Sequence, residues 1–295
     1  MPDAQIDAIR SLLAARPRAA GLAERRARLD ALGSHYSLAS DVAAEAVDAG
    51  GAAAEWTRTP VADASRVVLF FHGGGYVAGS LASHRHMVAE LGRQARATTL
   101  AVDYRLAPEH PFPAALDDAL AAYRFLLGRG FRPDDIAIAG ESAGGGLAVA
   151  GLVSLRDAGD ALPACAWLSS PWTDLEMSGD SMDEKAAVDP LISREYLREL
   201  AAQYLAGADA RGPLVSPLYA DLRGLPPLLV DCGSAETLLD DSVRLARAAG
   251  LADVRVDLRI WPDMIHAFSL FYQQVDAGRR ALVEAGAFIA AHFGA

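Results

Sequence analysis

The sequence predicts an α/β fold built on a mostly parallel sheet, and the pattern of its apolar segments is the main reason. These segments are short, almost wholly apolar and suited to strands that are buried on both faces. They lie at residues 66–71, 98–104, 136–140, 165–170, 225–232 and 254–261. Because helix-compatible stretches separate them, we expect parallel pairing with helices on both sides of the sheet. No fixed-period repeat and no linker rich in Pro, Gly or Ser divides the chain, which favours a single domain over residues 1–295.

The chain that precedes these segments predicts two helices and a hairpin. Apolar side chains recur at helical spacing in two stretches of the first forty residues, at Ile6, Ile9, Leu12 and Leu13 and then at Leu22, Leu29 and Leu32. Two short apolar runs within residues 41–58 surround a turn that ends in paired glycines, which can supply the positive φ that a tight turn needs. We expect these runs to form an antiparallel edge of the sheet.

A stretch at about 176–215 interrupts the alternation of strands and helices. It contains an amphipathic segment, residues 193–207, whose first residue Ser193 is a suitable helix N-cap. Ligands of parallel sheets bind at the carboxyl ends of the strands. We therefore expect a helical lid over that end of the sheet, formed by about residues 1–40 and about 176–215.

Composition and charge exclude several classes of protein. Of the 295 residues, 52% are hydrophobic and 22% are charged, which is typical of a globular chain and not of a disordered one. The formal net charge of −11 disfavours nucleic acid and anionic membrane surfaces, because both would repel the protein. A neutral small molecule is the ligand that suits such a surface.

Cysteine usage and the N-terminal residues bear on the compartment. Cys165 and Cys232 each lie in an apolar run, so buried free thiols are favoured over a disulfide framework. The first residues include acidic side chains and lack a basic region followed by an apolar stretch, so neither a signal peptide nor a membrane span is predicted. A cytoplasmic location is the resulting expectation.

The segment IAIAGESAGGGLA carries the clearest chemical signal. A buried strand ends at Gly140, passes through Ser142, and continues as a helix after Gly144, which forms the pattern GxSxG. The turn between such a strand and helix is tight and strained, so small residues must flank the serine, whose Oγ is then exposed above the sheet. The helix also directs its N-terminal amides at developing negative charge. We therefore predict that Ser142 is a nucleophile.

A second glycine-rich segment, HGGGYVAGS, follows the first buried strand. Glycines allow the backbone to approach a substrate closely and to direct N–H groups at a carbonyl oxygen. We predict Gly73, Gly74 and Ala143 as the donors of an oxyanion hole. A phosphate-binding loop is disfavoured because no GK[ST] or GxGxxG pattern is present here. His72 is predicted to be a hydrogen-bonded structural residue of this loop.

A serine nucleophile needs a base and an acid, and in a fold where the serine lies on such a strand-to-helix turn they follow it in the chain order Ser, acid, His. Only His266 and His292 come after Ser142, and His266 follows the last strand-like segment, where a loop must reach the edge of the sheet. His266 is therefore the predicted base. Glu236, in the loop after residues 225–232, is the preferred acid. Asp240 is the alternative, although a place in the first turn of the next helix would also explain it.

The remaining histidines and one tryptophan carry weaker signals. His84 and His86 form an isolated HxH without a nearby carboxylate or cysteine cluster, so a solvated helix start is favoured over a metal site. We expect no metal and no cofactor. Trp172 follows a strand and is predicted either to line the substrate pocket or to be an ordinary core residue.

Taken together, these motifs resemble those of the bacterial hormone-sensitive-lipase-like esterases, also called family IV or GDXG, of the α/β-hydrolase superfamily. The resemblance rests on HGGGYVAGS, VDYRLAPEHPFPAAL, GESAGGGLA, SPWTDL, GSAETLLDD and PDMIHAF, and it covers most of the chain. It implies an α/β-hydrolase fold with a helical lid, the triad Ser142, Glu236 and His266, short- or medium-chain acyl esters as substrates, and frequent homodimers through an edge strand. One departure is that many relatives carry Asp, in a DPL-type sequence, where this chain has Glu236.

The expected function is therefore hydrolysis of carboxylic esters through an acyl-enzyme. The same groups could also attack lactone or amide carbonyls, so a lactone hydrolase or an amidase is an alternative within enzymes. A small-molecule receptor of the same fold is the alternative from another class, because fold does not determine function. The presence of a serine, a histidine and a suitable acid argues against the receptor.

Overall fold

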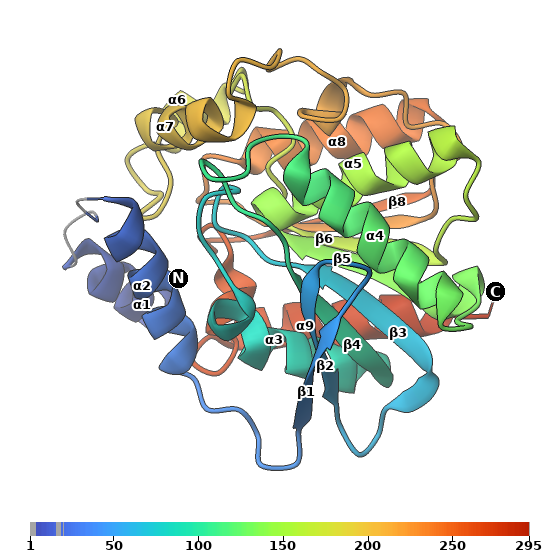
Figure 1. The fold of residues 1–295 in the computed structure, drawn as a ribbon. Coiled ribbons are helices and arrows are strands. Elements are labelled where there is room, and N and C mark those ends of the chain that lie inside the picture. Colours follow the sequence, from blue (N-terminus) through green and yellow to red (C-terminus); the bar gives the residue numbers. More distant parts are fainter. Residues whose placement is uncertain (1–3, 16–18, 20, 295) are drawn as a thin grey trace.

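A central sheet with helices on both faces forms the protein in the computed structural model, which describes residues 4–15, 19 and 21–294 (Figure 1). The described strands are β1 (Ala43–Asp48), β2 (Ala53–Arg58), β3 (Asp63–Phe71), β4 (Ala97–Asp103), β5 (Ile136–Glu141), β6 (Cys165–Ser169), β7 (Leu228–Gly233) and β8 (Val256–Trp261). The described α-helices are α1 (Ala4–Ala14), α2 (Leu22–Ser34), α3 (Leu81–Ala95), α4 (Ala114–Gly128), α5 (Ala143–Ala158), α6 (Ser181–Glu184), α7 (Arg194–Leu205), α8 (Leu239–Leu251) and α9 (Asp276–His292). Short 3₁₀ helices span Pro133–Asp135, Pro217–Tyr219 and Phe268–Phe271.

The six predicted strands correspond to β3 to β8, and they pair in parallel. β3 to β7 are largely buried, whereas β8 lies at the edge of the sheet and is half-exposed, so the predicted burial of β8 was wrong. The strand order across the sheet is β1-β2-β4-β3-β5-β6-β7-β8, and only the pairs β1/β2 and β2/β4 are antiparallel. The predicted antiparallel edge is thus confirmed as well. Gly50 and Gly51 have φ values of 79° and 98° in its turn, and the Gly51 N–H donates to Asp48 Oδ1 over 2.6 Å.

The sheet separates two hydrophobic cores because successive side chains of a strand point to opposite faces. On β3, Val67, Leu69 and Phe71 belong to the core shared with α4, α5 and α8, whereas Val68 and Phe70 belong to the core shared with α3 and α9. Burial on both faces explains why the parallel strands are continuous apolar runs. It also places β5 in the middle of the sheet with both faces covered, so its C-terminal end is held rigidly.

The first predicted lid segment contains α1 and α2, and the second contains α6 and α7. All four helices lie on the left of Figure 1, to one side of the sheet. Ser193 caps α7 as predicted, because its Oγ accepts the Tyr196 N–H over 3.3 Å. Residues 1–3, 16–18 and 20 of the predicted lid lie outside the described residues. That these segments open and close over a ligand remains a prediction.

The state of the cysteines and the presence of membrane-spanning helices can be compared with the predictions. Cys165 and Cys232 are both free and buried, as expected. Among the described helices, none combines the length and the apolar character that crossing a bilayer requires.

Two glycines inside helices give a test of the packing between α9 and α3. A Cβ added at Gly286 in α9 would lie 2.4 Å from Gln94 Cβ and 2.5 Å from the Gln94 carbonyl carbon in α3. Gly286→Ala should therefore lower the free energy of unfolding by about 1–3 kcal/mol. The matched control is Gly151→Ala in α5, where an added Cβ meets nothing within 4 Å and should raise stability by about 0.5–1 kcal/mol. Urea unfolding midpoints would measure both, and a stabilised Gly286→Ala would contradict the packing described.

Candidate active site

Ser142 lies on a sharp turn between β5 and α5. Its backbone has φ 54° and ψ −119°. Residues with a Cβ rarely adopt this combination, which persists only where the surrounding structure enforces it. A Cβ at Gly140 would lie 2.1 Å from the Gly144 carbonyl oxygen, and one at Gly144 would lie 2.1 Å from the Phe71 carbonyl oxygen. The predicted need for small residues on both sides of the serine therefore has a direct steric cause.

The turn brings Ser142 into hydrogen-bond contact with the predicted base. His266 Nε2 lies 2.9 Å from Ser142 Oγ, although 124 residues separate the two in sequence. His266 is buried and lies in the loop after β8, before the short 3₁₀ helix at Phe268–Phe271. This is the geometry in which an imidazole can accept the proton of a serine hydroxyl.

Glu236 is the carboxylate that faces the other nitrogen of this imidazole. Its Oε1 lies 3.5 Å from His266 Nδ1. Its Oε2 accepts hydrogen bonds from the Gly233 N–H and the Ser170 hydroxyl, each over 2.8 Å, so the carboxylate is fixed from behind. A fully buried carboxylate with these supports can fix the orientation of the imidazole ring.

The other acidic residues near this loop have different partners. Asp240 Oδ2 accepts the Ser181 N–H over 2.9 Å, which ties α8 to α6. Asp231 lies inside β7, and its two oxygens accept the indole N–H groups of Trp167 and Trp261. Burial raises the pKa of the Asp231 carboxyl to about 6. Of Glu236, Asp240 and Asp231, Glu236 is the one whose carboxylate faces His266.

The charge environment of His266 determines when it can act as a base. Burial on its own lowers the pKa of the imidazole, but hydrogen bonding to Glu236 and the negative charges of Glu236, Glu141 and Asp189 outweigh this and raise the pKa from 6.5 to about 9. His266 therefore remains protonated to a higher pH than an ordinary histidine does.

The glycine-rich loop approaches Ser142 with its second and third glycines. Gly74 and Gly75 line the cavity over Ser142 and have φ values of 117° and 66°. Among the described residues, none accepts a hydrogen bond from the N–H of Gly74, Gly75 or Ala143. Gly73, which the sequence suggested as a donor, does not line this cavity, and its N–H is directed at His84 Nε2 at 3.3 Å. Gly75 was missed, although it belongs to the same run of glycines.

His72 has the structural role that the sequence predicted. Its Nδ1 lies 2.8 Å from the Gly73 carbonyl oxygen, its ring stacks on Tyr104 with centroids 4.2 Å apart, and Tyr104 donates its hydroxyl hydrogen to the His72 carbonyl. Burial lowers the pKa of the His72 imidazole to about 3, so the ring is neutral. It holds the loop through neutral hydrogen bonds and stacking.

Two expectations about other residues need correction. His84 and His86 were expected at a solvated helix start, but both are buried in α3, at 2% and 3% exposure. His84 contacts Glu141, which the pattern of the motif did not single out, and His86 Nε2 contacts the Leu270 carbonyl. Trp172 does not line the cavity over Ser142. It is fully buried in the core, and its indole N–H donates to the Asp174 carbonyl.

The cavity over Ser142 is small and continues outwards. It has a volume of about 130 Å³, and its apolar wall comes from α2 and α7 and from Leu191 and Ile192 before α7. A second cavity of about 280 Å³ shares Leu29, Leu32 and Gly74 with it and extends between α1, α2 and α7. Both predicted lid segments thus contribute walls to the space above the serine.

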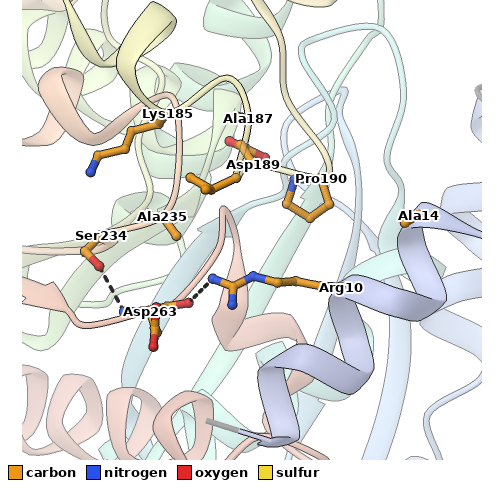
Figure 2. A pocket seen from close by; sticks show the side chains of 10 residues that line it. Arg10, Ala14, Lys185, Ala187, Asp189, Pro190, Ser234, Ala235 and Asp263 are labelled. Atoms are coloured by element: carbon orange, nitrogen blue, oxygen red, sulfur yellow. Dashed lines mark hydrogen bonds between the residues drawn. The ribbon is translucent and has the colours of Figure 1, made fainter. Parts of the chain in front are cut away.

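A larger hollow of about 610 Å³ is lined in part by Ser234 and Ala235, the two residues that precede Glu236 (Figure 2). Asp189, one of its lining residues, connects two parts of the structure. Its Oδ1 accepts the N–H groups of Leu191 and Ile192, and its Oδ2 accepts the N–H of Thr237 over 2.8 Å. Asp189 therefore joins the wall of the serine cavity to the residue that follows Glu236.

The comparisons with known proteins agree with this geometry. A solved structure of an esterase from the bacterial hormone-sensitive lipase family superimposes with a TM-score of 0.97 at 42% identity and covers 100% of both chains. A family model described as the alpha/beta hydrolase fold matches residues 68–270, which is more than half of the chain. The chain belongs to the bacterial hormone-sensitive-lipase-like family of α/β-hydrolase esterases.

Curated relatives of this esterase support the same activity. An acetyl-hydrolase from Streptomyces hygroscopicus is 48% identical over 83% of this chain and 82% of its own length. An esterase from Acinetobacter venetianus is 38% identical over 77% of this chain and 75% of its own length. The predicted fold, family and ester-hydrolase function are confirmed, and the protein is an enzyme that acts on small ester substrates.

Proposed function

We propose that this esterase hydrolyses short-chain acyl esters with Ser142 as nucleophile, His266 as general base and Glu236 as the acid of the triad. The observation that carries the proposal is the 2.9 Å contact between His266 Nε2 and Ser142 Oγ at the floor of the small cavity. Glu236 Oε1 lies 3.5 Å from Nδ1 on the opposite side of the ring, and in this proposal the carboxylate orients the imidazole and favours the tautomer with a free electron pair on Nε2.

The reaction then runs in two halves. His266 Nε2 takes the hydroxyl proton as Ser142 Oγ attacks the ester carbonyl carbon, and the same proton passes to the alcohol oxygen as the bond to carbon breaks. Water next attacks the carbonyl carbon of the acyl-enzyme and gives a proton to His266. The bond to Ser142 Oγ then breaks, the acid is released, and His266 returns the proton to Ser142 Oγ. The imidazolium forms twice, so its stabilisation affects both halves.

The oxyanion hole in this proposal consists of the N–H groups of Gly74, Gly75 and Ala143. Each lacks an acceptor among the described residues, and Gly74 and Gly75 line the cavity. A buried donor without an acceptor is costly, so such groups at a reaction centre indicate an acceptor supplied by the substrate. Gly73 was the sequence-based choice, but its N–H is directed at His84, which is why we prefer Gly75.

The size of the cavity favours small acyl groups. Its volume of about 130 Å³ is well below the roughly 300–1,000 Å³ that is usual for small-molecule sites. The name of the Streptomyces relative, acetyl-hydrolase, points in the same direction. We infer that acetyl and similarly short acyl groups occupy this cavity, while the outer cavity between α1, α2 and α7 receives the other part of the ester.

Assembly and location belong to the same proposal. We infer a homodimer through the β8 edge, because β8 pairs on one side only within the described sheet and exposes Ile260 at 45%. Size-exclusion chromatography with light scattering would test the dimer. A cytoplasmic location is also part of the proposal.

The first prediction concerns the nucleophile. Ser142→Ala removes the attacking oxygen without enlarging the side chain and should reduce kcat for p-nitrophenyl acetate by about 10⁶-fold, because the remaining groups cannot form an acyl-enzyme. A fluorophosphonate probe should label the wild type and leave this variant unlabelled. Turnover close to that of the wild type in Ser142→Ala would overturn the proposed mechanism.

The second prediction separates the two candidate acids. Glu236→Gln keeps the shape but loses the charge that holds the imidazole, and kcat should fall by about 10⁴-fold. Asp240→Asn is the matched control, because Asp240 contacts Ser181 instead, and its kcat should stay within a few-fold of the wild type. A larger loss of kcat in Asp240→Asn than in Glu236→Gln would reverse the assignment.

The third prediction concerns pH. His266 accepts a proton only when it is neutral, and its pKa is raised to about 9. The protonated, inactive form therefore persists to a higher pH, and kcat/KM should fall as pH decreases through this raised value. The acid limb of the kcat/KM profile with p-nitrophenyl acetate should lie above pH 6.5, the ordinary value for histidine. A limb below pH 6.5 would contradict the charge environment described.

A further inference from the structure

A second buried carboxylate faces the imidazole of His266, and the mechanism above does not use it. Glu141 lies between Gly140 and Ser142 at the end of β5 and is 3% exposed. Its Oε1 lies 3.7 Å from His266 Nε2, the nitrogen that contacts the Ser142 hydroxyl. Glu236 and Glu141 thus approach the two nitrogens of one ring, from Nδ1 and from Nε2 respectively.

The other oxygen of Glu141 is held by His84. Glu141 Oε2 lies 3.0 Å from His84 Nε2, and both side chains are almost completely buried. Gly73 makes room for this contact, because a Cβ there would lie 2.0 Å from Glu141 Oε2. The carboxylate therefore occupies a space that the first glycine of the loop leaves open.

The hydrogen bonds around His84 indicate where its hydrogens are. Ser83 Oγ donates its hydrogen to the Ser80 carbonyl, so it must accept from His84 Nδ1, 2.7 Å away. At Nε2, Glu141 Oε2 lies 3.0 Å away, and the Gly73 N–H is also directed at this nitrogen over 3.3 Å. Through its two ring nitrogens, His84 thus connects Ser83, the Gly73 N–H and the Glu141 carboxylate.

The position of Glu141 matters because Nε2 of His266 gains a proton when Ser142 attacks. A negative charge 3.7 Å away stabilises that proton in a site with little water. A carboxylate that moved into direct contact would instead hold the proton on Nε2 and displace the Ser142 hydroxyl. The contact of Glu141 with His84 opposes this movement, because it fixes the second oxygen on the far side of the carboxylate.

We propose that Glu141 is a positioning residue that stabilises the protonated form of His266 during both halves of the reaction, and that His84 keeps Glu141 from pairing directly with His266. This inference rests on the triad proposed above. The charged groups that influence His266 are Glu236, Glu141 and Asp189, and those in contact with Glu141 are His84 and His266. The negative charge of Glu141 also contributes to the raised pKa of Tyr104.

The main test removes the charge of Glu141 while keeping its shape. In Glu141→Gln the acid limb of kcat/KM for p-nitrophenyl acetate should move to lower pH by about one pH unit, and the plateau should fall roughly tenfold, because His266 becomes a weaker base. Glu141→Asp keeps the charge and should leave the limb close to that of the wild type. An unchanged limb in Glu141→Gln, or equal shifts in both variants, would overturn the proposal.

A double-mutant cycle tests the role of His84. His84→Leu removes the imidazole that contacts Glu141, so Glu141 can approach His266 and the acid limb should move to higher pH. The same substitution in the Glu141→Gln background should leave the limb where Glu141→Gln alone places it. If His84→Leu raises the limb equally in both backgrounds, His84 acts independently of Glu141 and its proposed role fails.

Controls separate this inference from the proposed function. Glu55→Gln removes a buried charge that pairs with Arg85 in another part of the fold, and its acid limb should coincide with that of the wild type. A limb that moved as far as in Glu141→Gln would indicate an effect of net charge and overturn the inference. Each variant is titrated with a fluorophosphonate to count active sites, so a misfolded fraction does not alter the profile. Activity that survives Ser142→Ala would refute the triad, whereas an unmoved limb in Glu141→Gln would refute the role of Glu141 alone.

Discussion

The tight turn at Ser142 is the constraint on which the rest of the site depends. A residue with a side chain is held at φ 54° only because β5 is fixed from both sides by β3 and β6 and because Gly140 and Gly144 allow the backbone segments to approach within contact distance. The strain lifts the hydroxyl above the sheet and starts α5 directly beneath it. The glycine-rich loop, the imidazole and the cavity wall are all arranged around that one oxygen.

The imidazole of His266 shows how opposing electrostatic effects are balanced in a dry site. Burial disfavours a charged ring, yet the reaction requires the ring to become charged twice. Three carboxylates reverse the effect of burial, and the resulting pKa is about 9. The same charges that make the ring a strong base also keep it protonated at moderate pH. The enzyme therefore loses activity at low pH, but the imidazolium that forms in the transition state is more stable.

Much of this arrangement could be predicted from the sequence, because local patterns have local causes. The apolar runs gave the six parallel strands, and the patterns around Ser142 and His266 placed both residues at the carboxyl edge of the sheet, where they meet. The glycine-rich loop lies beside Ser142, as the sequence indicated, but a run of three glycines does not say which N–H groups point inwards, and Gly75, which lines the cavity, was passed over. The buried state of His84 was missed because its partner Glu141 is 57 residues away in sequence. Trp172 illustrates the same limit, since a tryptophan after a strand suits both a pocket wall and the core.

The cavity wall has one part in α2, Leu29 and Leu32, and another before α7, Leu191 and Ile192. Because Asp189 binds only the second part among these four residues, substitutions in the two parts should differ in their effect on the enzyme. Leu29 and Leu32 come from α2, which is joined to the end of the glycine-rich loop by the bonds from Arg26 to the Val77 carbonyl and from the Ser80 hydroxyl to Asp30. Leu191 and Ile192 share Asp189 with the backbone of Thr237, next to the triad acid. A redesign that shifts the backbone of Leu191 or Ile192 therefore changes selectivity and turnover together, because it also moves the residue next to Glu236. Libraries meant to alter substrate scope are better placed at the side chains of Leu29 and Leu32 in α2.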